Sequence, residues 1–190
     1  MATVLASASP RRKTILEMLG VKDLRVVPAS GDEVIPEDAG PAETVKCLSA
    51  AKALEVAKNC SQSDVIIAAD TIVWLHERIL GKPSDAAEAA AMLEELSGNC
   101  HEVYTGVTVI RGDTVLSDHE VSRVFFRQLT EEEIAGYIGT GEPMDKAGAY
   151  GAQGIGALFI KRIEGDFFNV MGLPVCKLGE MLKKLGVLLL

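Results

Sequence analysis

The stretch Thr3–Arg12, which reads TVLASASPRR, joins an apolar segment to the start of a helix. Its first four residues are apolar and partly β-branched, which is typical of a buried strand. Ser9 is placed to cap the helix, and Pro10 to occupy the first helical position, where a missing N–H costs nothing. The helix should end at Gly20, a residue that readily adopts the left-handed C-cap conformation. The stretch therefore predicts a buried strand followed by a helix, around which the rest of the chain is organised.

Arg11 and Arg12 are the unusual feature of this stretch, because they fall in the first turn of the expected helix. The helix dipole disfavours cations there and favours anions. With an anion bound, small residues would let the backbone approach and the guanidinium groups would grip its oxygens, as in a phosphate cradle. A solvated basic turn is the alternative. The Walker pattern G-x-x-x-x-G-K-[ST] is missing from the sequence, so a P-loop is excluded.

The chain has 190 residues, of which 48% are hydrophobic, and this is enough to bury one sizeable core. The sequence has no linker-like composition, charge block or fixed repeat, so we expect one domain over residues 1–190. The N-terminus does not read as a secretory signal, and the closing stretch Val187–Leu190 is too short to span a bilayer.

The formal net charge of −8 argues against broad binding to the phosphate backbone of DNA or RNA. The four cysteines are widely scattered and show no C-x-x-C spacing, which favours free buried thiols in a reducing cytoplasm over disulfides or zinc ligands. The three histidines show no metal-ligand spacing, and we expect them to be structural or surface residues.

The continuous apolar run that leads to Asp70 and Thr71 is the strongest strand signal in the chain, over residues 65–71. A run of this kind suits a strand covered on both faces, as in parallel sheets. We expect the strand to end at these two polar residues. Ligands of open α/β sheets gather at the carboxyl ends of strands, so Asp70 is a candidate functional residue.

The remaining elements follow from hydrophobic periodicity and turn signals. Helices are expected over residues 41–58, 84–97, 130–138 and 175–185. Strands are expected over residues 24–27, 72–75, 78–80, 102–110, 114–116, 121–127 and 158–160. The strand over 102–110 should be broken at Thr105-Gly106. In the first of these helices, Lys52 lies among the apolar positions, where a solvated residue is the simplest interpretation. These positions are Val45, Leu48, Ala51 and Leu54. Pro83 restrains the backbone after Lys82, which indicates that this lysine is aimed.

Residues 139–156 form a second unusual stretch, rich in glycine and interleaved with charged and amide side chains. Such a composition predicts an irregular backbone that folds closely around something. A flexible surface loop is the alternative, but it would not need this mixture of opposite charges.

Together these features supply a set of cations and acids at element ends, at turns or on a neighbouring helix. Carboxylates of this kind can hold Mg²⁺ or Mn²⁺ and activate water, while cations neutralise a triphosphate and its leaving group. The pattern indicates hydrolysis of a phosphoanhydride. The set comprises Arg11, Arg12, Lys52, Lys82, Lys146, Glu33, Asp70 and Asp145.

The sequence resembles the Maf-type nucleoside triphosphate pyrophosphatases over essentially the whole chain. The residues and motifs that carry the resemblance occur in the family's order. They are Leu5–Arg12, Glu33, Lys52, Ala69–Thr71, Gly81–Pro83, Tyr104–Gly106, Gly141–Gly151 and Gly172–Pro174.

The resemblance implies conversion of a nucleoside triphosphate and water to the monophosphate and pyrophosphate, with a divalent metal, Mg²⁺ or Mn²⁺. Asp70 matches the general base, and Glu33, Lys52 and Lys82 match other catalytic positions. Glu33 and Asp70 are the expected metal ligands. By the same resemblance, phosphate is held by Ser7, Arg12 and Lys146.

The resemblance also implies a choice of base, since Arg11, Thr71 and Gln153 match the branch that prefers dTTP and UTP. A glutamine offers both a donor and an acceptor, as the pyrimidine edge requires. The branch that prefers 7-methyl-GTP carries Trp, Gln and Glu at these positions.

The implied fold is a single α/β domain, an elongated twisted mixed sheet flanked by helices, and the implied protein is a cytoplasmic homodimer. Its expected partner is the nucleotide substrate, with no nucleic acid and no membrane. A nucleotide-binding regulator of septum formation with little turnover is the alternative function. The chain departs from the family at Cys47-Leu48-Ser49, which leaves the packing of that helix open.

Overall fold

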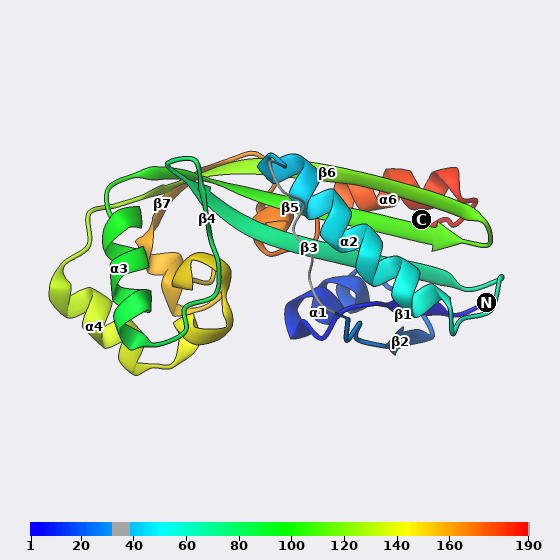
Figure 1. The fold of residues 1–190 in the computed structure, drawn as a ribbon, viewed down its shortest axis with the longest axis horizontal. Coiled ribbons are helices and arrows are strands. Elements are labelled where there is room, and N and C mark those ends of the chain that lie inside the picture. Colours follow the sequence, from blue (N-terminus) through cyan, green and yellow to red (C-terminus); the bar gives the residue numbers. More distant parts are fainter. Residues whose placement is uncertain (32–38, 190) are drawn as a thin grey trace. The chain divides into compact units, whose positions relative to one another are not determined.

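The computed structural model describes residues 1–31 and 39–189. The chain forms two compact units (Figure 1). Unit 1 comprises Met1–Asp70, Thr105–Glu120 and Gly172–Leu190, and unit 2 comprises Thr71–Tyr104 and Val121–Met171. The expectation of a single domain stays a prediction.

Strands and helices alternate in the N-terminal half of the chain, and the longest strands lie in its middle. The strands are β1 (Thr3–Leu5), β2 (Leu24–Val26), β3 (Val65–Leu75), β4 (Arg78–Leu80), β5 (Cys100–Arg111), β6 (Thr114–Phe126) and β7 (Ile160–Glu164). The α-helices are α1 (Pro10–Met18), α2 (Pro41–Ala57), α3 (Ala86–Leu96), α4 (Glu131–Gly139), α5 (Phe167–Val170) and α6 (Val175–Lys184). Short 3₁₀ helices are η1 (Glu142–Asp145), η2 (Ala147–Ala149) and η3 (Ile155–Phe159).

The strands form one mixed sheet in the order β2-β1-β3-β5-β6-β7, with β4 pairing on β3. β1 runs parallel to both β2 and β3, whereas β4 and β7 run antiparallel to their partners. The predicted α/β class, a mixed sheet flanked by helices, is confirmed.

In unit 1, helices cover both faces of the sheet, with α2 in front of the strands and α6 behind them (Figure 1). The α2 face is apolar because Ala53 and Val56 pack with alternate residues of the strands, among them Ile66 and Ala68. Alternate residues of a strand share a face, so this packing also sets which residues of β3 point toward α2. A buried, continuous apolar strand is the expected result of cover on both faces.

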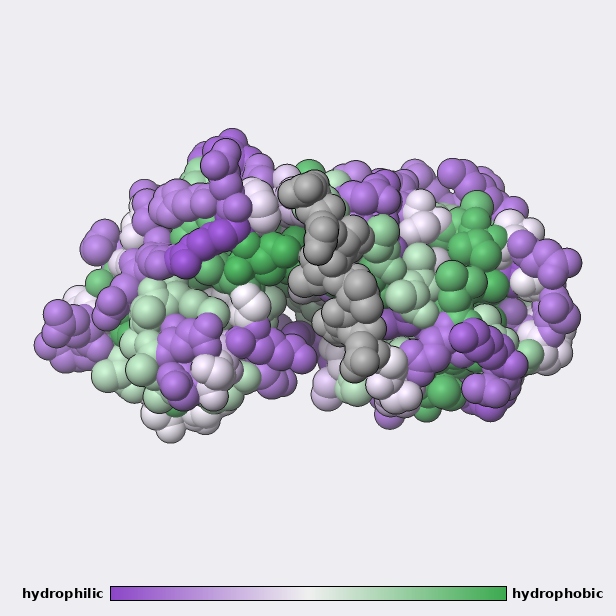
Figure 2. All heavy atoms as spheres, in the orientation of Figure 1, coloured by the Kyte–Doolittle hydropathy of each residue, from purple (hydrophilic) through white to green (hydrophobic). Residues whose placement is uncertain are grey.

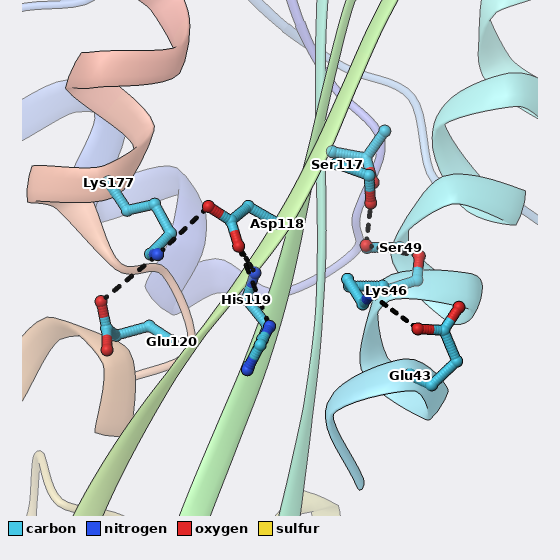
Figure 3. Close-up of polar contacts among 9 residues, drawn as sticks. Glu43, Lys46, Ser49, Ser117, Asp118, His119, Glu120 and Lys177 are labelled. Carbon is cyan, nitrogen blue, oxygen red and sulfur yellow. Dashed lines mark hydrogen bonds and ion pairs between the residues drawn. The ribbon is translucent and has the colours of Figure 1, made fainter. Parts of the chain in front are cut away.

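A chain of hydroxyl groups fastens α2 to the sheet. The Oγ of Ser49 lies 2.9 Å from Oγ1 of Thr108 on β5, which lies 2.9 Å from Oγ of Ser117 on β6 (Figure 3). Ser49 and Thr108 are fully buried, so each hydroxyl needs such a partner. At Cys47-Leu48-Ser49, where the sequence departs from the family, α2 therefore packs with Ser49 facing the sheet.

On the opposite face, Lys177 of α6 forms ion pairs with Asp118 and Glu120 of β6, at 3.2 Å and 3.8 Å (Figure 3). The two acids are two residues apart in a strand and therefore point to the same side. The backbone N–H of His119 and the charge of Lys177 lower the pKa of Asp118 although its burial opposes this.

At Gly106, strand β5 lies directly against the backbone of α2. A Cβ atom at this position would lie 2.1 Å from the carbonyl oxygen of Val45. Only glycine permits so close an approach, since real Cβ atoms essentially never come within 3.0 Å of another heavy atom.

Unit 2 has its own core, in which α3, α4 and the aromatic side chains of the C-terminal segments pack on the strands. Tyr137 and Phe159 stack edge to face with their ring centroids 4.9 Å apart. His101 is buried in the same core. One ring nitrogen, Nε2, lies 2.7 Å from the hydroxyl of Tyr150, and burial lowers the pKa of His101 to about 3. Burial also raises the pKa of Tyr150, so both groups are neutral at physiological pH.

Several local predictions are confirmed. Ser9 caps α1, accepting from the N–H of Arg12, and Pro10 opens the helix. Gly20 has the expected positive φ of 75°. Thr130 and Glu133 form a capping box on α4. All four cysteines lie in the described part of the chain and are free thiols, but none is buried as expected: Cys176 is exposed and the other three are half-buried.

Other predictions are wrong. Strand β3 does not end at Asp70 but continues to Leu75, because the residues after Thr71 are also apolar and pair with β4. Strands β5 and β6 likewise run unbroken where interruptions were expected. The segment predicted as a strand over 158–160 is mostly 3₁₀ helix, with β7 beginning at Ile160. On α2, the apolar positions Val45 and Leu48 are buried as expected, but Leu54 is exposed, and Ala53 and Val56 are buried instead.

On the face shown in Figure 2, hydrophobic residues gather in patches that are surrounded by hydrophilic residues. Large apolar side chains that are exposed include Met18 and Leu54 in unit 1 and Leu158 and Phe167 in unit 2. Within the described ranges, none of the helices is long and apolar enough to cross a membrane.

Candidate active site

Asp70 lies on β3, beyond the point where the neighbouring strand β1 has ended. Leu5, the last residue of β1, pairs with Ile67, and the next N–H, of Ala6, donates to the carbonyl of Ile67 at 2.8 Å. After that, β1 leaves the sheet and uncovers one side of β3. The carboxylate of Asp70 is therefore at the carboxyl end of a parallel strand pair, where α/β folds bind ligands.

The partner of Asp70 is Lys52, whose ammonium group donates a hydrogen bond to Oδ1. Ile66, Ala68 and Asp70 alternate along β3, so Asp70 points to the face that α2 covers. The side chains of Lys52 and Asp70 are only 20% and 11% exposed, and this low exposure strengthens the attraction between their opposite charges. The structure thus brings together the predicted base and a predicted catalytic lysine, and Lys52 is not a solvated helix residue.

A second cluster in unit 1 is built by Arg12. Its guanidinium donates from Nη1 to Oγ of Ser7 at 3.0 Å and from Nε to the carbonyl of Gly172 at 2.8 Å. The N–H of Ser9 donates to the same hydroxyl of Ser7 at 3.2 Å. These bonds fix the guanidinium beside the N-terminus of α1, where an anion is favoured. Two of the three predicted phosphate ligands, Ser7 and Arg12, are therefore in contact.

Arg11 occupies the same first turn of α1 and is half-buried. Its charge adds to that of Arg12 at the end of the helix that is least favourable for cations. The turn therefore concentrates positive charge in a protein whose net charge is −8.

Unit 2 places Lys82 in the turn after β4, where its side chain is exposed and Pro83 is buried. The carbonyl of Gly81 accepts a hydrogen bond from the N–H of Gly148 at 3.0 Å. Gly148 has a φ of 67°, and a Cβ there would touch Val73 at 3.0 Å. The turn that carries Lys82 is therefore tied to the segment that carries the third predicted phosphate ligand.

That ligand, Lys146, is mostly buried, with 12% of its side chain exposed. Its ammonium group donates to the carbonyl of Glu142 and to Oδ1 of Asp145, each at 2.6 Å. An ammonium group has three donors, so these two contacts leave one for a ligand.

The other predicted specificity residues in unit 2 are Thr71 and Gln153. Thr71 is half-buried in β3, directly after Asp70, and Gln153 is exposed in the glycine-rich segment. Glu33 lies outside the described residues, so its predicted roles as a catalytic residue and a metal ligand stay predictions.

The metal prediction can be tested on the donor set. Within residues 1–31 and 39–189, no three His, Cys, Asp or Glu side chains converge on one point. Asp70 alone supplies a carboxylate among the expected ligands that the structure describes. Mg²⁺ commonly binds one or two carboxylates and takes its remaining ligands from water and substrate phosphates. One carboxylate at the strand end fits that mode.

Three groups next to the predicted residues were missed by the sequence reasoning. The carbonyl of Gly172 holds Arg12, and the side chains of Glu142 and Tyr137 contact each other at 2.9 Å beneath the glycine-rich segment. Gly172 and Glu142 lie in two of the motifs that carry the family resemblance, and this could have indicated a role for them. Tyr137 lies in a helix with no such signal.

A surface hollow of about 410 Å³ lies elsewhere in unit 1, at the β5–β6 hairpin. Of the predicted site residues that the structure describes, none lines it. Its lining residues are Gln62, Arg111, Gly112, Thr114, Lys184 and Leu185.

Comparison with known proteins places these features in a family context. Residues 2–185 match the family described as Maf-like protein. The chain is 50% identical over 184 residues to the dTTP/UTP pyrophosphatase of Alkaliphilus metalliredigens, covering 95% of this chain and 94% of the relative. It is 47% identical over 186 residues to the dTTP/UTP pyrophosphatase of a Thermoanaerobacter species, with coverage of 97% and 96%.

Similarity to solved structures is more distant. A HAM1 protein from Coxiella burnetii aligns with 66% of this chain and 73% of its own, at 17% identity and a TM-score of 0.45. A nucleoside-triphosphatase/dITP/XTP pyrophosphatase from Mycobacterium abscessus aligns at a TM-score of 0.42 and 17% identity, over 68% of this chain and 76% of that protein. The family assignment rests on the sequence relatives.

Proposed function

The chain belongs to the family of Maf-like proteins, and from that premise we propose that it is a nucleoside triphosphate pyrophosphatase acting on dTTP and UTP. Water attacks the α-phosphorus, the bond to the β-phosphate bridging oxygen breaks, and the products are the nucleoside monophosphate and pyrophosphate. This is the activity named for relatives that match almost the whole chain.

The observation that carries the proposal is the pairing of Asp70 with Lys52 at the carboxyl end of the β1–β3 pair. A carboxylate held in one orientation by a neighbouring ammonium group can accept a proton from an attacking water. The relatives supply the name of the reaction, and this pair supplies the groups that such a reaction needs.

The remaining residues have electrostatic roles in this proposal. Ser7 and Arg12 bind phosphate oxygens at the N-terminus of α1, and Lys82 and Lys146 neutralise further charge on the triphosphate. Cations aimed at phosphate oxygens stabilise charge that develops on the leaving pyrophosphate, which is the main source of catalysis in phosphoryl transfer.

A divalent cation, Mg²⁺ or Mn²⁺, is proposed as the cofactor. Asp70 would hold it together with Glu33, which lies outside the described residues. When bound, such an ion polarises phosphate oxygens and lowers the pKa of water. The part of this chain is to present hard carboxylate oxygens and to orient Asp70 through Lys52.

The choice of base is assigned to Arg11, Thr71 and Gln153. The exposed amide of Gln153 offers one donor and one acceptor group to a pyrimidine edge. A site that hydrogen-bonds a base rejects a mismatched one strongly, because its own polar groups are left unpaired. We also propose that the protein is cytoplasmic and that it forms a homodimer. Light scattering of the purified protein would test the homodimer.

The experiment that tests the function is steady-state release of pyrophosphate from dTTP, UTP, GTP and 7-methyl-GTP, with and without Mg²⁺. We expect kcat/KM for dTTP and UTP to exceed the other two by at least about tenfold. Gln153→Glu should erode this preference, since it replaces an amide donor by a charge.

The alternative, a regulator of septum formation that binds nucleotide with little turnover, makes the opposite prediction. It would bind dTTP and release no pyrophosphate. A preference of the unmodified protein for 7-methyl-GTP would contradict the assignment of the base-reading residues. Failure of the unmodified protein to release pyrophosphate from any of the four nucleotides would contradict the pyrophosphatase activity.

A further inference from the structure

The glycine-rich segment of unit 2 folds around a single side chain, that of Glu142. Its Oε1 accepts a hydrogen bond from the N–H of Gly156 at 3.2 Å, and its Oε2 accepts from the N–H of Ile155 at 3.0 Å. Oε1 also accepts from the hydroxyl of Tyr137 at 2.9 Å. Both carboxylate oxygens are therefore occupied by donors, and two of these come from the backbone that directly follows Gln153 and Gly154.

The segment leaves no space between its backbone and this carboxylate. Gly154 has a φ of 122°, and a Cβ there would lie 2.8 Å from both carboxylate oxygens of Glu142. A Cβ at Gly156 would lie 2.6 Å from the hydroxyl of Tyr137. The glycines are thus needed so that the chain can close on the Glu142–Tyr137 pair.

The opposite end of the segment is fixed to the same pair. The N–H of Gly151 donates to the hydroxyl of Tyr137 at 3.2 Å, so this hydroxyl donates to Glu142 and accepts from Gly151. Lys146 donates to the carbonyl of Glu142 at 2.6 Å, and a Cβ at Gly151 would meet its side chain at 2.9 Å. Gln153 therefore stands at the tip of a loop, residues 151–156, that is held at both ends.

The environment keeps Glu142 ionised. Burial opposes ionisation, but the hydrogen bonds from Ile155, Gly156 and Tyr137, together with the charge of Lys146, hold the pKa of Glu142 below its ordinary value. A carboxylate that accepts several hydrogen bonds is bound more tightly than a neutral acceptor would be.

We propose that Glu142 is a positioning residue that fixes the loop 151–156 through Ile155, Gly156 and Tyr137, and thereby sets the base preference of the enzyme. This inference rests on the proposed function, because it assigns base reading to Gln153 on that loop. Glu142 touches neither the base nor the phosphates in this role. It acts by restricting where the amide of Gln153 can lie.

The test combines Glu142→Gln and Tyr137→Phe with a control, Glu131→Gln, at an exposed position in the first turn of α4. Glutamine has one acceptor oxygen, so one of the two backbone N–H groups would face an amide donor instead. Phenylalanine keeps the ring packing but removes the hydroxyl that joins Glu142 to Gly151.

Two readouts are measured for each protein. Hydrogen exchange of the 151–156 amides should accelerate by at least about tenfold in Glu142→Gln, because exchange follows local opening. The ratio of kcat/KM for dTTP to that for GTP should fall by about tenfold in the same variant. Tyr137→Phe should shift both readouts in the same direction, and Glu131→Gln should match the unmodified protein.

The outcomes separate the proposal from a general structural role. A variant that is merely less folded would lose turnover of every nucleotide by the same factor, and such a result would overturn the proposal. An unchanged rate of hydrogen exchange at the 151–156 amides in Glu142→Gln would overturn the proposal that Glu142 fixes this loop. Faster exchange with an unchanged dTTP/GTP ratio would overturn the link to base choice while leaving the pyrophosphatase assignment intact. An unmodified protein that hydrolyses no nucleotide would refute the proposed function directly.

Discussion

Asp70 and Lys52 form an ion pair although they are 18 residues apart in the sequence. Asp70→Asn keeps the shape of the side chain but removes the proton acceptor and the charge that attracts a metal. We expect kcat to fall by roughly 10²–10⁴. Nucleotide binding should survive because the surrounding cations remain, and this can be measured as the Kd for dTTP.

A matched control lies at the other end of β3. Asp64 is as buried as Asp70 and accepts from the N–H groups of Ala2 and Ser61, which lower its pKa. Asp64→Asn should lower the urea midpoint but keep kcat. Near-normal turnover in Asp70→Asn, or an equal loss in both variants, would show that Asp70 is not the base.

His101 makes a prediction about pH. Its pKa in the folded protein is about 3, below its ordinary value of 6.5. Below pH 6.5 the unfolded chain therefore takes up a proton that the folded chain cannot, so stability is lost as the pH falls. We expect this group to make the free energy of unfolding about 2 kcal/mol lower at pH 5 than at pH 7.5.

The measurement is urea unfolding at several pH values for the unmodified protein and for His101→Gln. The variant should lose the part of the slope between pH 7.5 and pH 5 that His101 supplies. His76→Asn, at an exposed position in the β3–β4 turn, should keep the full slope. Equal slopes in the His101 variant and the unmodified protein would contradict the buried neutral imidazole.

Single residues were predictable where their signal is local. Ser9, Pro10 and Gly20 follow from capping rules that involve only neighbouring backbone groups. The role of Glu142 was not predictable, because its two backbone donors lie 13 and 14 residues later, beyond the glycine-rich turns.

Among the elements, α2 is the one whose position determines the Asp70–Lys52 contact. The helix approaches β5 at Gly106, opposite Val45, and presents Lys52 about two turns further on. Gly106→Ala should push the helix away from the sheet. We expect the free energy of unfolding to fall by about 3 kcal/mol or more, since the new methyl group meets backbone atoms that cannot rotate away.

The control is Gly136→Ala in α4, where a Cβ would meet no heavy atom within 4 Å in the described part of the chain. That change should stabilise the protein by about 1 kcal/mol, because alanine favours the helix. Urea denaturation measures both variants. An unchanged midpoint in Gly106→Ala would mean that α2 can shift without loss, and kcat would then show whether Lys52 still reaches Asp70.

The elements were predicted well where apolar spacing is regular, as in α3 and α4, and less well where tertiary pairing decides. The extent of β3 beyond Asp70 depends on its pairing with β4, which a strand propensity does not encode. The buried face of α2 was only partly predictable, because Ser49, a polar residue, occupies a sheet-facing position, where its hydroxyl pairs with that of Thr108.

At the scale of the whole molecule, both units share strands β3, β5 and β6. Continuous strands should couple their unfolding, so we expect one cooperative transition. Trp74, the single tryptophan, lies in the part of β3 that belongs to unit 2, and its fluorescence reports on that unit. Far-UV circular dichroism reports on the helices of both units.

The two signals should have coincident urea midpoints if the chain is one domain, as the sequence predicts. Two separated midpoints would contradict it. The sequence could predict the class of the fold, since strands and helices alternate along it. It could not predict the division into units, because three of the four crossings fall within strands, and the polar pair Asp70 and Thr71 indicates the end of a strand rather than a boundary between units.

The unit boundaries have a consequence for how this protein can evolve. The chain passes between the units at residues 70–71, 104–105, 120–121 and 171–172, and the first three of these crossings lie within strands. Neither unit can therefore be exchanged by recombination as one continuous segment. An exchange would have to join three strands at their midpoints and keep each of them in register. A length error of one residue at any splice would reverse the faces of all the side chains that follow in that strand. Insertions and deletions should instead accumulate at turns such as the one at Gly112, so lineages can vary the rims of the protein while inheriting its two units together.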